Sequence, residues 1–93
     1  NRKRRETAKF LALDAMHETG IKTLKPRVVV HYHFYNTREI DLDNLIIGMK
    51  STLDGIVDSG LIEDDNPSKL KLEAEFTLCK KEEKKTLITV AEI

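Results

Sequence analysis

The sequence predicts a small α+β domain in which helices pack on one face of a mixed sheet. Its length of 93 residues suits a single domain that spans residues 1–93. Two segments repeat apolar residues at helical spacing, and three others are rich in β-branched residues or alternate between apolar and polar residues. The expected order is helix, strand, helix, strand, strand, and the last two strands are expected to form an antiparallel hairpin.

The first two elements lie on either side of Pro26. Residues 6–19 form the first expected helix, which ends at Gly20, where a left-handed C-cap is typical. Its apolar positions are Ala8, Leu11, Ala12, Ala15 and Met16. Residues 27–35 form the first expected strand. One face of this strand carries Val28, Val30, Tyr32 and Phe34, and the other carries Val29, His31, His33 and Tyr35.

A second helix and two more strands complete the domain. The helix has its apolar positions between residues 45 and 57 and stops at Ser59 and Gly60. These positions are Leu45, Ile46, Met49, Leu53, Ile56 and Val57. Residues 69–78 alternate almost perfectly, which predicts a half-buried strand. Its inward residues are Leu70, Leu72, Ala74, Phe76 and Leu78. A charged connection, residues 80–85, leads to the last strand, residues 86–93.

Positive and negative charges balance over the whole chain, with 16 Lys and Arg against 16 Asp and Glu. A nucleic-acid contact must therefore come from local clusters of basic residues, at residues 2–5, 22–27 and 80–85. Glu82 and Glu83 dilute the last cluster, which we interpret as solvated surface. The first cluster is the least diluted, and we expect it to contact phosphates.

Several features point to a cytoplasmic protein. The single cysteine, Cys79, excludes an internal disulfide. No apolar stretch is long enough to cross a bilayer, and no signal-peptide pattern opens the chain. Because the chain begins at Asn1 rather than at a methionine, we also expect that upstream sequence has been trimmed.

Two acidic pairs flank the second expected helix. Asp41 and Asp43 precede it, and Asp64 and Asp65 follow it. In an extended backbone, residues two apart point the same way with Cα atoms roughly 6.5 Å apart, so Asp41 and Asp43 can share a divalent ion. The alternative is structural: Asp41 or Asp43 caps the helix, and Asp64 and Asp65 decorate an exposed turn.

The residues around these acids resemble the signature of the RusA-like family of Holliday-junction resolvases. The matching segments are Asp41-Leu42-Asp43-Asn44-Leu45, then Leu53-Asp54-Gly55, then Gly60-Leu61-Ile62-Glu63-Asp64-Asp65. Their order and spacing match that family over roughly residues 28–78. The family also has an amino-terminal strand, which is not visible in this sequence.

The resemblance implies a compact homodimer that binds four-way DNA junctions by their shape and nicks opposing strands in recombination and repair. It implies Mg²⁺, or Mn²⁺, held by Asp41, Asp43 and Asp65, with Asp64 as a helper. Such an ion activates water and offsets charge that grows on the phosphate oxygens. The chain would then be a crossover junction endodeoxyribonuclease.

One position departs from the family pattern. Family members usually carry a lysine four residues after the second Asp of the motif, and this chain has Ile47 there. Lys50 lies seven residues after Asp43, and in one continuous helix it would project from nearly the same face. We hypothesise that Lys50 partly replaces the missing catalytic cation.

Other sequence features favour weaker interpretations. His31 and His33 form a His-x-His pattern that binds a transition metal if a third ligand converges, but no companion Cys or His lies nearby in sequence, so we interpret them as exposed strand residues. Nothing suggests a covalent hydrolase or a nucleotide cofactor. The rival functions are a non-catalytic junction-binding relative, which Ile47 favours, and an interaction module.

Overall fold

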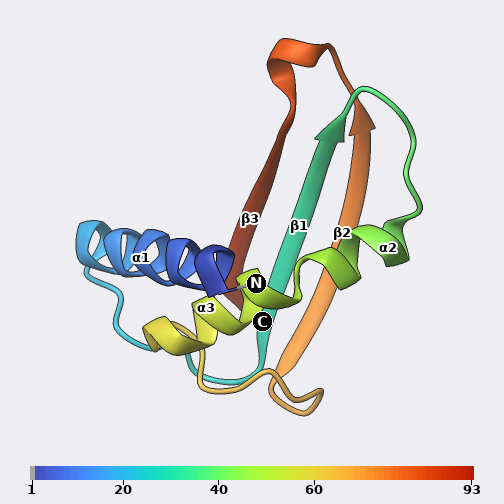
Figure 1. Cartoon of the computed structure of the whole chain (residues 1–93). Helices are drawn as coiled ribbons and strands as arrows, with labels where there is room; N and C mark the ends of the chain where they lie inside the picture. The colour runs from blue at the N-terminus through green and yellow to red at the C-terminus, as the bar shows by residue number, and fades with distance from the viewer. Residues whose placement is uncertain (1) are drawn as a thin grey trace.

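The computed structural model describes residues 2–93 and contains a three-stranded mixed sheet with helices on one face (Figure 1). The elements are α1 (Arg2–Thr19), β1 (Val28–Asn36), α2 (Leu42–Gly48), α3 (Lys50–Ser59), β2 (Leu70–Leu78), the 3-10 turn η1 (Lys81–Glu83) and β3 (Lys85–Glu92). The predicted α+β class is therefore confirmed. Within residues 2–93, none of the helices combines the length and the apolar character that crossing a membrane requires.

Strand β1 lies at the centre of the sheet, in the order β2-β1-β3. It runs parallel to β2, which follows it through α2 and α3, and antiparallel to β3. The predicted hairpin between the last two strands is wrong, because β2 and β3 flank β1 instead of pairing with each other. Strand β1, which has no Lys, Arg, Asp or Glu, takes the centre, while the strands that carry Lys and Glu take the edges, where charge discourages further strand pairing.

The core lies between the sheet and the helices. The inward face of β1 is buried as predicted, at Val28, Val30, Tyr32 and Phe34. Leu53 and Ile56 of α3 pack on this face together with Ile62 and Leu70. The row predicted to face inward on β2 is only partly covered, since Leu72 and Leu78 are exposed. Strand β2 is an edge strand, and this position leaves part of its apolar row uncovered.

The predicted second helix is two helices. Met49 separates α2 from α3 with φ −90° and ψ 3°, directly after Gly48, a residue type that weakens helices. The predicted apolar stripe still packs against the core, and the end at Gly60 is confirmed, with φ 85° in the left-handed region. Asp43 and Lys50 therefore lie in two different helices, and the predicted single helix is wrong.

Helix α1 packs on α3 at a glycine. A Cβ atom at Gly55 would collide with the backbone oxygen of Arg5 and lie 2.8 Å from the Cβ atom of Ala8. Ala8 and Ala12 are buried, whereas Phe10 and Leu11 are more than half exposed. The helix is therefore held close to α3 through small residues, and it starts earlier than predicted, so that residues 2–5 are helical.

Candidate functional site

Asp41 and Asp43 lie at the start of α2, and both are exposed. Asp41 occupies the N-cap position, and its backbone oxygen accepts a hydrogen bond from the Leu45 N–H at 3.1 Å. Its carboxylate makes no capping hydrogen bond. Asp43 Oδ1 accepts the N–H of Asn44 at 3.1 Å. The capping role therefore does not account for the Asp41 carboxylate.

Lys50 begins α3 and joins two acids. Its Nζ atom lies 3.0 Å from Asp54 Oδ1 and 3.1 Å from Asp65 Oδ2. The contact with Asp65 crosses from the helix to the loop before β2, so the fold brings together two predicted site residues 15 positions apart. Asp54 was not predicted as a site residue, although its place four residues after Lys50 in a helix is a recognised pairing signal.

The contacts of Lys50 alter the acidity of the group. The pKa of Lys50 is raised, first by its hydrogen bond with Asp54 and then by that with Asp65. The pKa of Asp65 is lowered, chiefly by the hydrogen bond from Lys50. Both residues therefore stay charged near neutral pH, and the Lys50 ammonium group lies beside the Asp65 carboxylate.

Asp64 shapes the loop that carries Asp65. Its Oδ1 atom accepts the Asp65 N–H at 2.7 Å, and its Oδ2 atom accepts the Asn66 amide at 3.0 Å. Both carboxylate oxygens are thus used within the turn. This arrangement favours a positioning role for Asp64 over direct contact with a metal ion.

The structure does not gather the three acids into one site. Among residues 2–93, the one group of three metal-ligating side chains is formed by other residues, so Asp41, Asp43 and Asp65 do not converge within 4.8 Å. The carboxylates suit Mg²⁺ in kind, because Mg²⁺ prefers oxygen ligands. They do not suit one ion in their present arrangement. Asp41 and Asp43 lie at the N-terminal end of α2, whereas Lys50, at the start of α3, contacts Asp65.

Ile47, at the position where the family pattern has a lysine, has 72% of its surface exposed. An exposed isoleucine contributes little to the core. A longer, charged side chain at this position would therefore meet solvent and not a packed interior.

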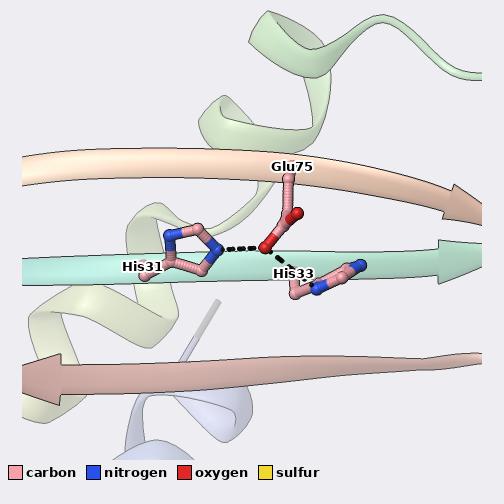
Figure 2. Close-up of side chains that lie close together, drawn as sticks. All are labelled: His31, His33 and Glu75. Atoms are coloured by element: carbon pink, nitrogen blue, oxygen red, sulfur yellow. Dashed lines mark hydrogen bonds and ion pairs between the residues drawn. The ribbon is translucent and has the colours of Figure 1, made fainter.

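His31 and His33 project from the sheet face opposite the core, and Glu75 of β2 lies between them (Figure 2). Glu75 Oε1 is 2.8 Å from His31 Nε2 and 3.1 Å from His33 Nδ1. The pKa of His31 is raised, first by the hydrogen bond with Glu75 and then by that with Glu73. Glu75 thus lies beside both histidines, although no companion Cys or His lies nearby in sequence.

Glu75 was not predicted as a partner of the histidines, because it lies 44 residues after His31 and is neither Cys nor His. The alternation of β2 already placed Glu75 on the outward face. The parallel pairing that puts Glu75 beside His33 depends on tertiary structure. The sequence did not predict that β2 is a pairing partner of β1.

The first basic cluster lies on α1, next to α3. Arg5 binds Asp58 of α3 through two hydrogen bonds, one of them 2.9 Å from Nη2 to Oδ1. Lys3 and Arg4 line a shallow hollow with Thr52 of α3. Basic groups therefore lie on one flank of α3, and Lys50 lies at its start.

Comparison with known proteins adds no relative. A scan of family models, a search of curated proteins and a search of solved structures each found no match to this chain.

Proposed function

We propose that this chain is a metal-dependent endodeoxyribonuclease that cuts four-way DNA junctions in recombination and repair. The observation that carries the proposal is the contact between Lys50 Nζ and Asp65 Oδ2 at 3.1 Å. It sets a cation beside the last acid of a motif that resembles the RusA-like signature. Two further observations support it: the Asp41 carboxylate is not used for capping, and the basic start of α1 lies on the flank of α3.

We propose that Lys50 stabilises the negative charge on the scissile phosphate. Its side chain is 65% exposed, so a DNA backbone can approach it without unfolding the loop. An ammonium group next to the scissile phosphate would stabilise the negative charge that grows during hydrolysis. Asp54 and Asp65 hold this ammonium group in place from two sides.

The proposed cofactor is Mg²⁺, or Mn²⁺, with Asp41, Asp43 and Asp65 as its ligands. When bound, such an ion supplies an activated water and offsets charge on the phosphate oxygens. The three acids do not form one group in the structure, so binding of one ion by all three would require Asp41 and Asp43 to move toward Asp65.

The proposed partners are branched DNA and a second copy of this chain, in the cytoplasm. Two equivalent sites related by a two-fold axis would suit the two equivalent strands of a junction. The exposed apolar side chains of α1 support a protein contact, and a groove of about 410 Å³ between α1 and β3 has a largely apolar lining. Small-angle scattering that shows a monomer at all concentrations would contradict the dimer.

The decisive experiment is cleavage of a synthetic mobile four-way junction, with linear duplex as the control substrate. We expect symmetric nicks in Mg²⁺, none in EDTA, and none with Asp65→Asn. Glu63→Gln is the matched control, because Glu63 lies in the same loop and pairs with Lys69 instead of Lys50. Equal cleavage by Asp65→Asn and wild type would overturn the assignment.

A second variant tests the departure from the family pattern. Ile47 is exposed, so Ile47→Lys is expected to fold normally. If Lys50 replaces the usual lysine only in part, Ile47→Lys should raise the cleavage rate above that of wild type. A lower rate with unchanged junction binding would count against a cation requirement at this position.

The second candidate function is junction binding without efficient cleavage. The separation of Asp41 and Asp43 from Asp65 favours it. Wild-type chain that retards the junction in a gel, and that leaves both strands intact in Mg²⁺ and in Mn²⁺, would establish this alternative.

A further inference from the structure

A cluster on the open face of the sheet has the chemistry of a transition-metal site. Its ligand atoms are His31 Nε2, His33 Nδ1 and a carboxylate oxygen of Glu75, which all lie within 4.8 Å of one another (Figure 2). The two histidines are two residues apart on β1, and Glu75 pairs with His33 across the parallel β1–β2 register. The positions are set by the backbone of the two strands.

The spacing of these atoms is close to that of ligands on one ion. Ligands about 2.0–2.1 Å from a tetrahedral zinc ion are about 3.3 Å from one another. The carboxylate oxygen of Glu75 lies 2.8 Å from the nitrogen of His31 and 3.1 Å from that of His33. The distances from Glu75 to the two histidines are therefore close to the spacing of ligands on one ion, and the three ligand atoms all lie within 4.8 Å of one another.

The ring nitrogens that face away from Glu75 have partners of their own. His31 Nδ1 lies 3.3 Å from Glu73 Oε1, and His33 Nε2 lies 2.7 Å from Thr77 Oγ1. Metal-ligating histidines almost always donate their other N–H to such an acceptor, which fixes the ring and raises its basicity. Glu73 accepts a proton carried on Nδ1 of His31, and in that tautomer the Nε2 lone pair is available to a metal ion beside Glu75.

A cation at the centre of this arrangement would be bound by all three side chains. A carboxylate oxygen and an unprotonated imidazole nitrogen repel each other unless a cation, a proton or a metal ion, lies between them. Two imidazoles and one carboxylate form the ligand set of several catalytic zinc sites, which leave a fourth position open. Imidazole favours zinc-class ions over Mg²⁺, which prefers oxygen ligands alone.

We propose that His31, His33 and Glu75 bind a divalent transition-metal ion of the zinc class. Glu73 and Thr77 hold the rings of His31 and His33 in place. This site is separate from the proposed nuclease residues, because it lies on the sheet face opposite the core, whereas α3, which carries Lys50, packs on the core side. The bound ion joins the central strand β1 to the edge strand β2. The fourth ligand position faces the open side of the sheet, since the two histidine side chains are 30% and 20% exposed.

The test is metal binding by tag-free, EDTA-treated full chain, without DNA. We expect one Zn²⁺ per chain by calorimetry, visible tetrahedral bands with Co²⁺, and no displacement by excess Mg²⁺. His31→Gln, His33→Gln and Glu75→Gln should each weaken Zn²⁺ binding by about tenfold or more, and Glu73→Gln by about tenfold. His17→Gln, an exposed histidine at the end of α1, is the matched control and should bind as wild type.

A measurement on wild-type chain covers the case in which a variant fails to fold. With less than one equivalent of Zn²⁺, the imidazole NMR signals of His31 and His33 should shift together, and those of His17 should not. An absence of Zn²⁺ binding by wild type, or equal shifts of all three histidines, would overturn the proposal. Neither result depends on whether the chain cuts DNA, so this proposal and the proposed function can fail separately.

Discussion

The two faces of strand β1 differ sharply in burial and in chemistry. One face carries Val28, Val30, Tyr32 and Phe34, all at most 5% exposed and packed under α2 and α3. The opposite face carries His31, His33 and Tyr35, which bind acidic and hydroxyl groups of β2 or stack on one another. Successive residues of a single strand thus face a buried apolar core and a partly exposed polar surface in turn.

This difference shows where each kind of function can reside. The core face fixes α3 and the following loop, and these elements place Lys50 beside Asp65. Tyr32 belongs to that side, where burial raises its pKa to about 12 while Lys50 acts in the opposite direction. The open face is free to carry ionisable side chains, because no helix must be packed over it.

The largest expected difference in stability between the two faces of β1 is at the adjacent residues Val29 and Val30. Val30→Ala removes two methyl groups from a fully buried position and should lower the free energy of unfolding by about 2–3 kcal/mol. Val29→Ala is the matched control on the other face and should cost less than about 1 kcal/mol. Urea denaturation of both variants measures the difference. Equal losses would mean that the two faces are packed alike.

A smaller effect is expected at the contact between the helices on the covered face. Gly55→Ala places a Cβ atom against the backbone of Arg5 and should cost about 1–3 kcal/mol through overpacking. Gly48→Ala meets nothing within 4 Å and should be neutral or stabilise by about 0.4–1 kcal/mol. Thermal unfolding followed by circular dichroism distinguishes them. A stable Gly55→Ala variant would show that α1 is not held tightly on α3.

The smallest effect concerns the exposed ion pair that links α1 to α3. The Arg5 hydrogen bond lowers the pKa of Asp58, so its stabilising contribution is present above the ordinary aspartate pKa of about 3.9. That contribution is lost as pH falls through the lowered pKa. Arg5→Gln should therefore move the acid-unfolding midpoint to higher pH, whereas Arg38→Gln, in the exposed loop, should not. A midpoint that stays unchanged in Arg5→Gln would leave the ion pair without a role in stability.

The sequence predicted local features well. The alternation of residues 27–35 identified the buried face of β1, and Gly20 and Gly60 marked the ends of α1 and α3. These features depend on neighbours within a few residues, where backbone geometry and burial are directly encoded. The break at Met49 was missed because the apolar stripe continues across it.

Tertiary pairings could not be predicted in the same way. An alternating strand reveals which residues face the core but not which strand lies beside it. The sequence therefore predicted a hairpin of the last two strands, whereas both of them pair with β1. Because the pairing of β1 with β2 was not predicted, the proximity of Glu75 to His33 was not predicted either. The Lys50–Asp65 contact was likewise beyond local geometry, although the hypothesis that Lys50 supplies a cation already singled out this residue.

The most direct test of the account is the initial rate of junction cleavage in Mg²⁺ by wild type, Lys50→Ala and Lys69→Ala. Lys69 is a matched control, since it forms an exposed ion pair with Glu63 in the same loop. If Lys50 stabilises charge on the phosphate, Lys50→Ala should cleave about a hundredfold more slowly, and Lys69→Ala should cleave like wild type. Equal rates for Lys50→Ala and wild type, or no nicking by wild type, would contradict the account.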